Sequence, residues 1–385
     1  ISKQADINFG DKYKNSAFAY ADGRSYSSGL DFVNINIGSN WNQGKSNLGD
    51  YSFQTILHEI GHSLGLGHQG LYNGSGNYMD DSYFKNDSWQ SSIMSYFSQE
   101  ENTSTNVDFA YLNTYMSADW IALDNIYSSE GFSTKNAFAG DTTYGFNTNI
   151  PVSKSIIYSE MSSWINNNAY TLVDGSGIDT VDFSGFTSNQ LIDLRETELN
   201  STKLNYSNIG GKIGNLTIAS GTVIENAKGG SGSDSIIGNS ADNKIFGKAG
   251  DDTINGGKGN DRLYGGSSSD KLHGNSGKDY LKGDSGKDRL YGNSGADRLY
   301  GDSGNDRLYG GSSSDRLYGG SGKDYIKGDS GNDRLYGGSS SDRLYGNSGK
   351  DYIKGDSGND KLYGGSSSDR LYGNSGKDYI KGDSG

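Results

Sequence analysis

The sequence predicts an α+β domain followed by an all-β domain, a right-handed parallel β-roll. The first observation is a nine-residue period that gives 17 full repeats between Gly229 and Lys381, which is typical of a solenoid whose turns stack on their neighbours. The second is a mixture of strand-like alternation and helical spacing over the first 130 or so residues. The third is composition: 31% of the residues are apolar and 60 are glycine, so burial alone explains the stability of the whole chain poorly.

Three short strands are predicted near the start of the α+β domain. Apolar and polar residues alternate in ADINFG (5–10), SAFAYA (16–21) and DFVNINIG (31–38). This alternation places every second side chain on one face of a strand. The three segments therefore predict a small sheet ahead of the first helix.

Two helices are predicted in the same domain. Residues 51–65 have helical spacing and end at a glycine; the apolar positions on one broad face are Phe53, Ile56, Leu57, Ile60 and Leu64. Residues 117–128 predict a second helix with Ser117 as its cap; its apolar positions are Trp120, Ile121, Leu123 and Ile126.

Beyond the second helix the composition shifts toward Gly, Ser, Asn and Asp, and the pattern becomes β-like, as in GSGIDTVDFSGF (175–186). The regular repeats begin later, at Gly229. We therefore predict three parts: the α+β domain at 1–130, a β-rich junction at 131–228, and the β-roll at 229–385.

Charge and composition narrow the classes of function. The net charge is -13, which argues against nucleic acid as a partner because phosphate contacts need clustered positive charge. Carboxylates and backbone carbonyls are instead ligands for divalent cations such as calcium. The chain has no cysteine, so disulfides and thiolate chemistry are excluded, and no apolar run reaches the roughly 18 residues of a membrane span.

Three of the four histidines lie in one window, HEIGHSLGLGH at 58–68. On a helix His58 and His62 stand one turn apart on one face, so both imidazoles can bind one cation; zinc takes neutral imidazole and about four ligands. Glu59, on the adjacent side, can act as general base toward a water on that cation. The glycine at 65 can reverse the chain and return His68 as a third ligand. The alternative is a helix that carries histidines by chance.

A second motif, SIMSYF (92–97), follows about 25 residues after the histidine window. Taken alone it is an apolar turn or a short strand, with Met94 as a core side chain. Together with HEIGHSLGLGH, GLYNGSGNYMDDSYF and the nonapeptides GGSGSD and GKAGDD, it resembles the serralysins, secreted bacterial metzincin zinc endopeptidases of the M10 family. The similarity also runs through GDTTYGFNTN, DTVDFSGF and TVIENAKGGSGSDSIIGNSADN, and so covers nearly the whole chain.

This resemblance implies a zincin-like metzincin fold for the catalytic domain and an RTX fold for the roll. It implies that His58, His62 and His68 bind one catalytic zinc ion, and that Glu59 is the catalytic base. It also implies that Met94 is the Met-turn methionine. Tyr96 then ligates zinc at rest and hydrogen-bonds the tetrahedral intermediate, whereas chemistry alone makes Tyr96 a packed aromatic residue. SAFAYA matches the edge strand that pairs with an extended substrate.

The chain departs from the family pattern in two places. Gln69 stands where the family usually has proline after the third histidine, which should affect the rigidity of the loop more than ligation. Only 57 residues precede His58, so we expect the catalytic domain to lack its N-terminal elements.

The repeats predict a calcium-bound roll. In the pattern GGxGxDxUx, glycines stand where backbone carbonyls turn toward a shared ion, the sixth-place Asp supplies a carboxylate, and the eighth-place Ile or Leu points into a thin core. Asp fills the sixth place in all repeats but one, where Asn243 stands. Two repeats should make one turn, and we expect the C-terminal half to fold only on binding calcium. The alternative is a flexible Gly/Ser/Asp linker.

Several calcium-binding residues are expected from the family match and from the repeat pattern. The family match implies irregular calcium turns formed by Phe138, Gly140, Thr142, Asp174, Ser176, Gly177 and Asp179. It also pairs Glu225 with the first regular turn, at Gly230, Gly232 and Asp234. In the next repeats the expected residues are Gly247, Ala249, Asp252, Gly257, Gly259, Asp261, Asp270 and Asp279.

Some turns of the later repeats are expected to bind calcium weakly or not at all. Ser replaces the fourth-place Gly, at Ser268 for example, and Asp or Asn often replaces the second Gly, as at Asp284 and Asn347. A Ser in a left-handed conformation costs about 1 kcal/mol. His273 stands at the ninth place of a repeat, and we expect a solvated strand residue without a metal role.

The function implied by the resemblance is that of a secreted, extracellular, monomeric zinc endopeptidase stabilised by several calcium ions. Its substrates would be proteins or peptides, and its partners a type I secretion apparatus and a small proteinaceous inhibitor. Two alternatives remain. One is a calcium-dependent structural or adhesive protein with a vestigial protease domain. The other is a binding module in which the roll acts and the protease only processes it.

Overall fold

The computed structural model describes residues 6–10, 14–15, 17–21, 32–37, 48–72, 75–82, 84–131, 134–198 and 204–382. It divides into two compact units, which are described separately: Ile1–Gly140 with Asn149–Gly177 and Glu196–Thr222, and Asp141–Thr148 with Ile178–Arg195 and Val223–Gly385. The predicted division into three parts, at 1–130, 131–228 and 229–385, stays a prediction. In the part of the chain that the structure describes, no helix has both the length and the apolar character needed to cross a membrane.

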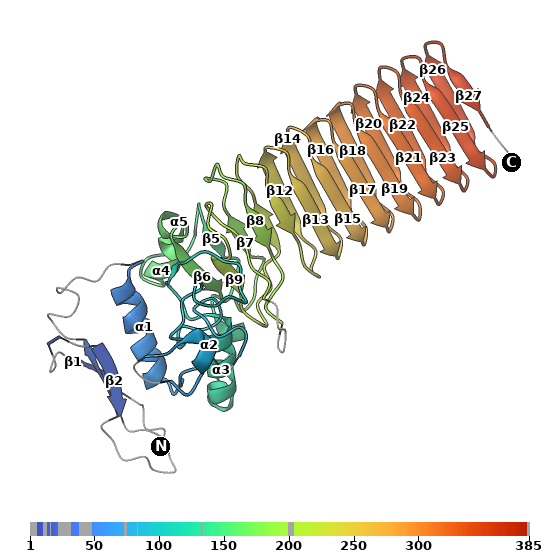
Figure 1. Ribbon diagram of the computed structural model, residues 1–385. Coiled ribbons are helices and arrows are strands. Elements are labelled where there is room, and N and C mark those ends of the chain that lie inside the picture. The colour runs from blue at the N-terminus through green and yellow to red at the C-terminus, as the bar shows by residue number, and fades with distance from the viewer. Residues whose placement is uncertain are drawn as a thin grey trace. The chain divides into compact units, whose positions relative to one another are not determined.

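The first unit contains a three-stranded sheet with the order β1-β3-β2 (Figure 1). The strands are β1 (Asp6–Gly10), β2 (Ala17–Ala21) and β3 (Phe32–Ile37). β3 pairs parallel with β1 and antiparallel with β2. The three predicted strands are confirmed to within a residue at each end, and β2 lies at an edge of the sheet.

Helix α1 (Tyr51–Ser63) is the predicted histidine-bearing helix. It begins at Asp50, whose side chain accepts a hydrogen bond from the N–H of Phe53 at 3.0 Å, the usual role of an N-cap carboxylate. It ends two residues before Gly65, whose φ is +89°. The N–H of Leu66 then donates to the carbonyl of Gly61 at 3.0 Å, so the chain reverses at the glycine as predicted.

The burial of α1 does not follow its apolar face. The predicted apolar positions are only half-buried, and the fully buried residues are Ser52, Gln54, Glu59, Gly61 and Ser63. Two contacts give the reason for Gln54 and Gly61. The Gln54 side chain accepts a hydrogen bond from the N–H of Leu112 at 2.9 Å. A Cβ on Gly61 would lie 2.6 Å from the sulfur of Met94. Gln54 and Gly61, seven residues apart, lie on one flank of the apolar face, where these contacts leave room only for a small or hydrogen-bonding side chain. Ser52, Glu59 and Ser63 lie on the opposite flank.

The rest of the first unit consists of short elements around a mixed core. Helix α3 (Ser117–Tyr127) has Met116 at its N-cap position, so the prediction of Ser117 as the cap is wrong. The Asp119 carboxylate accepts from the N–H of Met116 instead, and Ile126 is 45% exposed. A parallel sheet has the order β4-β6-β9. The remaining elements are α2 (Tyr78–Asp81), β4 (Tyr111–Leu112), η2 (Ser128–Glu130), η3 (Thr134–Asn136), α4 (Ile156–Ser159), α5 (Met161–Trp164), β6 (Asn168–Leu172) and β9 (Leu216–Ile218).

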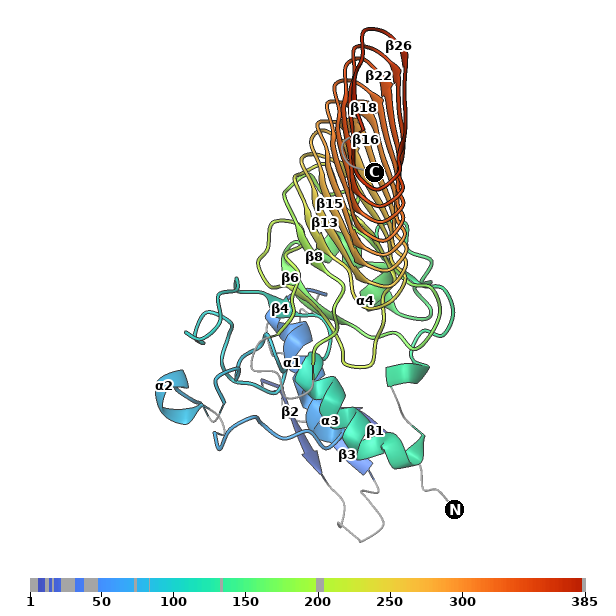
Figure 2. The ribbon, with the colours of Figure 1, turned by 90° about the vertical axis from the view of Figure 1, so that its right-hand side faces the viewer.

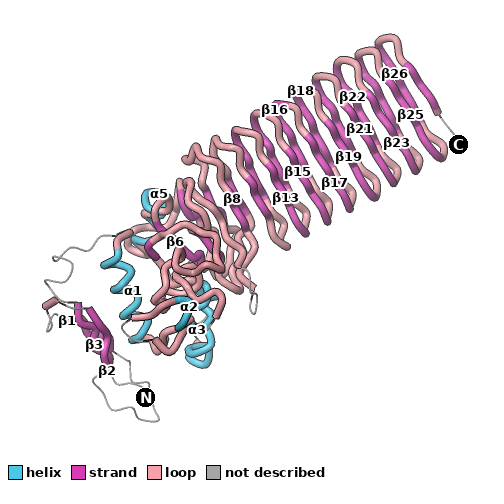
Figure 3. The backbone as a smooth tube through the Cα atoms, in the orientation of Figure 1, coloured by secondary structure: helices cyan, strands magenta, loops and turns pink. Residues whose placement is uncertain are grey.

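The second unit is built from two parallel sheets of 11 and 10 strands, with the orders β26-β24-β22-β20-β18-β16-β14-β12-β10-β7-β5 and β27-β25-β23-β21-β19-β17-β15-β13-β11-β8. Consecutive strands alternate between the sheets (Figure 3). The first strands are β5 (Thr143–Gly145), β7 (Thr180–Asp182), β8 (Leu191–Asp193), β10 (Asn226–Lys228) and β11 (Ser235–Ile237). The repeat strands are β12 (Lys244–Ala249), β13 (Thr253–Lys258), β14 (Arg262–Ser267), β15 (Lys271–Ser276), β16 (Tyr280–Gly286), β17 (Arg289–Ser294), β18 (Arg298–Gly304), β19 (Arg307–Ser312), β20 (Arg316–Ser321), β21 (Tyr325–Ser330), β22 (Arg334–Ser339), β23 (Arg343–Ser348), β24 (Tyr352–Ser357), β25 (Lys361–Ser366), β26 (Arg370–Ser375) and β27 (Tyr379–Lys381).

Register and burial in this roll follow the repeat. Leu299 pairs with Leu317, and Leu317 with Leu335, so sheet neighbours are two repeats apart and two repeats make one turn, as predicted. The eighth-place residues from Ile236 to Leu362 are all 0% exposed and form the predicted thin core. Figure 2 shows the successive turns stacked behind one another. The flexible-linker alternative is therefore wrong.

Candidate metal centres

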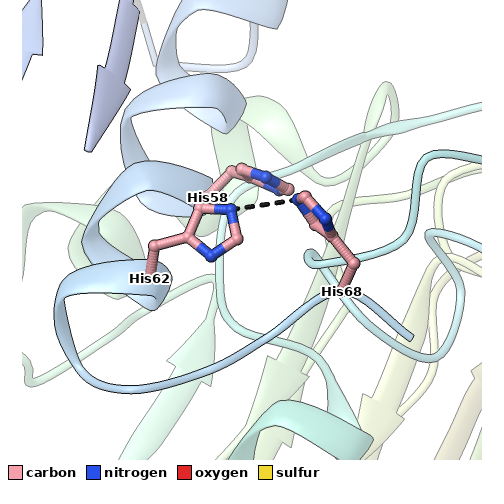
Figure 4. A group of neighbouring side chains, drawn as sticks. All are labelled: His58, His62 and His68. Carbon is pink, nitrogen blue, oxygen red and sulfur yellow. Dashed lines mark hydrogen bonds between the residues drawn. The ribbon is translucent and has the colours of Figure 1, made fainter. Parts of the chain in front are cut away.

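The three histidines of the window converge on one point. Their ligand nitrogens all lie within 4.8 Å of one another, and the Nε2 atoms of His62 and His68 are 3.0 Å apart (Figure 4). His58 and His62 come from adjacent turns of α1, and their rings meet edge to face at 4.7 Å. His68 reaches the same point because the chain reverses at Gly65.

Backbone carbonyls determine which nitrogen of each ring is available. The Nδ1 atoms of His58, His62 and His68 face the carbonyl oxygens of Ile93, Leu66 and Tyr72, at 2.8, 2.9 and 3.1 Å. A carbonyl only accepts, so each Nδ1 carries the proton and each neutral ring is left with a lone pair on Nε2. Unprotonated nitrogens this close repel each other unless a cation lies among them. The site therefore fits a metal ion that takes imidazole ligands, such as zinc.

Burial also favours the neutral form of two of these rings, His58 and His68. It lowers the pKa of His58 to about 4, with smaller contributions from the neighbouring His62 and His68, although the hydrogen bond to Ile93 opposes the shift. Burial likewise lowers the pKa of His68. Neutral imidazole is the form that binds a metal ion.

Glu59 and Tyr96 both lie beside the histidines. They line one cleft of about 460 Å³; its other lining residues are Tyr51, Gln54, Thr55, His58, Ser75, Gly76, Trp89, Ile93 and Ser95. Glu59 is 8% exposed. The ring of Tyr96 lies 4.4 Å from that of His68 and 6.1 Å from that of His58. The structure thus brings together all five residues predicted for the zinc site.

Met94 lies in a turn directly against α1. It is 1% exposed, and its sulfur occupies the space that a side chain on Gly61 would need. The turn is held from α3, because the Asp119 carboxylate accepts hydrogen bonds from the Ser92 hydroxyl at 2.6 Å and from the N–H of Ile93 at 2.8 Å. Of the two structures weighed for SIMSYF, the turn is correct.

A second buried carboxylate, Asp87, was missed from the sequence. It accepts hydrogen bonds from the hydroxyls of Tyr72, at 3.0 Å, and Ser95, at 2.7 Å. Burial raises the pKa of Asp87 and raises that of Tyr72 to about 12. Asp87 therefore ties the Met94 turn to the segment whose carbonyl, at Tyr72, orients His68. The only signal in the sequence was an acidic residue near SIMSYF, which is too common to single out.

In the roll, the sixth-place carboxylates form two ladders of identical contacts. One oxygen, Oδ1, accepts a hydrogen bond from the backbone N–H of the sixth-place residue 18 positions earlier. For example, the N–H of Asp234 donates to Asp252 at 2.7 Å, and the N–H of Asp252 donates to Asp270 at 2.8 Å. The other oxygen, Oδ2, is buried in every sixth-place Asp from Asp252 to Asp369, and accepts no hydrogen bond from any residue that the structure describes. Buried carboxylate oxygens need a partner, and these oxygens fit calcium, a hard cation that binds oxygen ligands.

The turns of the later repeats keep the conformation of the early ones. Ser268, Ser313, Ser340 and Ser367 have φ between +82° and +88°, so the fourth-place serines adopt the left-handed conformation that we expected to cost energy. The second-place residues Asp284 and Asn347 also have positive φ, at +69° and +75°. Burial raises the pKa of Asp270, Asp315 and Asp342 to about 8, in early and late repeats alike.

The residues of the predicted irregular calcium turns are divided between the two units. In the first unit, the N–H of Gly140 donates to the carbonyl of Ser176 at 2.6 Å, and that of Ser176 to the Asp174 carboxylate at 3.2 Å. Phe138 and Gly177 have positive φ.

In the second unit, the Asp179 carboxylate accepts from the N–H of Thr142 at 2.8 Å, and the Glu225 carboxylate accepts from that of Asp179 at 2.7 Å. The first regular turn is closed by Asp234, which accepts from the N–H of Gly230 at 2.7 Å. The pairing of Glu225 with this turn stays a prediction.

His273 lies on β15, and its ring stacks on that of Tyr291 at 4.6 Å with an interplanar angle of 6°. It is half-buried in this aromatic stack, so it is less solvated than we expected. Among the residues that the structure describes, the metal-binding cluster of histidines contains only the other three.

Comparison with known proteins gives three family matches. The family model for the peptidase M10 serralysin C-terminal region matches residues 133–368. A model of four RTX calcium-binding nonapeptide repeats matches residues 354–385. The N-terminal part, residues 2–69, matches a reprolysin-like model of metallopeptidase family M12B.

Curated relatives agree with these matches. The chain is 45% identical over 196 residues to "Metalloprotease AprA" of Pseudomonas entomophila (strain L48), 39% over 231 residues to "Metallopeptidase AprA" of Pseudomonas marginalis, and 40% over 236 residues to "Serralysin C" of Dickeya chrysanthemi. The matches cover 49%, 58% and 58% of this chain, but only 37%, 44% and 44% of the relatives. The chain therefore spans less than half the length of these relatives.

Proposed function

The chain belongs to the serralysin family of M10 peptidases, and from this premise we propose that it is a zinc-dependent endopeptidase whose β-roll binds calcium. The observation that supports the proposal best is the convergence of three Nε2 lone pairs next to a buried glutamate. His58, His62 and His68 would hold the zinc ion, and Tyr96 lies where it can join them. The bounds of the catalytic domain, 1–130, are part of the proposal.

The chemistry that we propose is hydrolysis of a peptide bond. A bound zinc ion would supply a Lewis acid and lower the pKa of a water molecule. Glu59 accepts a proton from the attacking water and returns it to the leaving amine. The Tyr96 hydroxyl donates a hydrogen bond to the carbonyl oxygen as negative charge develops there. The substrate backbone pairs with the edge strand β2, and the cleft beside Glu59 receives a substrate side chain.

Calcium is proposed to bind between successive turns of the roll. The buried Oδ2 atoms of the sixth-place aspartates, from Asp252 to Asp369, would be ligands together with carbonyls of the turns. Because this arrangement continues through the last repeats, we propose that the later turns bind calcium as well, some of them more weakly because of their left-handed serines. The irregular turns at Asp174, Asp179 and Glu225 are proposed as further sites.

Location and partners are proposed from the relatives. RTX repeats are typical of secreted proteins, so we propose an extracellular, monomeric protease exported by a type I apparatus. Proteins or peptides would be its substrates, and a small proteinaceous inhibitor a further partner.

The test compares the chain with its Glu59→Ala variant, both refolded with calcium and one equivalent of zinc. We expect one zinc ion in each protein, casein hydrolysis by the wild-type chain, and a loss of at least about a hundredfold in the variant because the general base is gone. Equal activity in both proteins would contradict the role of Glu59. Zinc binding with no hydrolysis in the wild-type chain would favour a vestigial protease, and hence an adhesive or structural protein or a binding module.

A further inference from the structure

The outer faces of the roll carry a regular arrangement that the protease does not use. The seventh and ninth places of each repeat flank the buried eighth place, so their side chains project together from the outer face of the sheet. On three neighbouring strands, β18, β20 and β22, the seventh place is Arg and the ninth is Tyr. We call these six residues the Arg–Tyr face: Arg298, Arg316, Arg334, Tyr300, Tyr318 and Tyr336.

The arginines of this face stand in register. Arg298 pairs with Arg316, and Arg316 with Arg334, so their positions repeat at the strand spacing of about 4.8 Å. Like charges directly side by side on a sheet are destabilising. The fold does not require arginine here, because Ser235 and Thr253 occupy the seventh place in β11 and β13.

These charges are not neutralised within the described part of the chain. None of the three guanidinium groups has an ion pair or a hydrogen bond to another described residue. Nearby acids have other partners: Asp302 is paired with Lys282 at 3.0 Å, and Asp329 with Lys327. The sixth-place aspartates are buried inside the roll. From Gly229 onward the chain holds 22 of the 34 Lys and Arg residues but 23 of the 47 Asp and Glu residues, so calcium binding leaves the outer faces positive.

The tyrosines restrict the kind of partner. Tyr300 stacks on Tyr318 at 4.7 Å and 6°, and Tyr318 on Tyr336 at 4.8 Å and 4°. Their flat faces are occupied by one another, which leaves ring edges and hydroxyls toward solvent. Single-stranded nucleic acid needs free aromatic faces for base stacking, and the grooves of a duplex need an inserted helix or ribbon. Guanidinium forks and hydroxyl groups instead suit the carboxylates or sulfates of a sugar chain.

We propose that the Arg–Tyr face binds an extended anionic polysaccharide lying along the roll, with its acidic groups on the guanidinium forks and its hydroxyls on the tyrosine edges. Charge complementarity identifies this partner, and a linear polymer matches a site that repeats from strand to strand. The proposal concerns the roll alone and does not rest on the proposed protease function.

The experiment measures binding of the full chain, in calcium, to three probes: an alginate oligosaccharide too short to gel, a heparin oligosaccharide and a neutral cello-oligosaccharide. One variant carries Arg298→Gln, Arg316→Gln and Arg334→Gln. A matched control carries Lys287→Gln, Lys323→Gln and Lys350→Gln, which removes the same charge from exposed fifth-place turn positions. Far-UV circular dichroism checks that both variants fold with calcium.

We expect binding to the alginate or heparin probe that weakens with salt, and no binding to the neutral sugar. The face variant should bind at least about tenfold more weakly, because three ion pairs are lost. The affinity of the control should fall by less than about twofold. The tighter of the two acidic probes distinguishes carboxylate from sulfate recognition. No binding to either acidic sugar, equal weakening in both variants, or tighter Arg-dependent binding to oligo-dT or anionic phospholipid vesicles would overturn the proposal.

Discussion

At the residue scale, the proposed zinc site depends on side chains that do not themselves bind the metal. Each histidine is oriented by a backbone carbonyl, and two of the three carbonyls, those of Ile93 and Tyr72, belong to segments held by buried carboxylates. Asp119 holds the turn at Ser92 and Ile93, and Asp87 joins Tyr72 to Ser95. Such outer partners affect metal affinity because they determine the direction of the ligand lone pairs.

We expect Asp87→Asn to weaken zinc binding by about tenfold, because the amide puts an NH2 group in place of Oδ2, which accepts from the Tyr72 hydroxyl at 3.2 Å, and because its oxygen is a weaker acceptor than a carboxylate. The carbonyl of Tyr72 then loses its position behind His68. Competition with a zinc chelator measures the effect. Asp80→Asn, which removes an equal charge from an exposed residue of α2, is the control. If both variants bind zinc like the wild type, Asp87 has no positioning role.

At the element scale, the end of α1 determines whether the third histidine reaches the site. Gly65 has φ of +89°, and a Cβ there would meet no atom within 4 Å, just as at Gly67. The two glycines thus differ in backbone conformation and not in available space, because Gly67 does not have positive φ.

For this reason Gly65→Ala should lower the free energy of unfolding by about 1 kcal/mol and weaken zinc binding, since the strained residue lies between His62 and His68. Gly67→Ala should leave the stability unchanged or raise it slightly by restricting the unfolded chain. Thermal unfolding with and without zinc compares the two variants. A larger loss at Gly67 than at Gly65 would mean that the left-handed turn is not what places His68.

At the scale of the whole molecule, the roll encloses a column of aspartates around a core one residue thick. Burial raises the pKa of Asp261 and Asp297 to about 7 and that of Asp315 to about 8, well above the usual value for an aspartate. Without calcium the folded roll therefore binds more protons than the unfolded chain. The extra protons stabilise the folded roll. This stabilisation is fully present below about pH 4 and is lost as the pH rises through the raised pKa values of the aspartates.

The calcium requirement expected from the repeats should accordingly apply only where these carboxyl groups ionise. The calcium-free chain, prepared in chelator, should show the β-sheet signal of the roll in far-UV circular dichroism at about pH 5 and lose it by about pH 8. Calcium should restore the signal at pH 8 by binding the ionised carboxylates, and magnesium should restore less because it is smaller and prefers to keep its water ligands. A signal at pH 8 that is the same with and without calcium would contradict both this pH dependence and the calcium requirement.

The sequence by itself determined the features that depend on local spacing. Residues i and i+4 of a helix share a face, so the spacing of His58 and His62 was enough to place both at one site, with Glu59 on the adjacent side. A glycine after the helix indicated the reversal that returns His68. The nine-residue period determined which residues of the roll are buried, because every turn repeats the same short-range geometry and the eighth place falls inward each time.

The tertiary structure alone decided the features that join segments distant in the sequence. The carbonyl of Ile93 behind His58, the carboxylates of Asp87 and Asp119, and the contact of Gly61 with Met94 have no local pattern. For the same reason α1 buries polar residues on both flanks of its apolar face while that face is only half-buried, and α3 has Met116 and not a serine at its N-cap position. Such contacts depend on which backbone segments approach one another, and that depends on the packing of the whole unit.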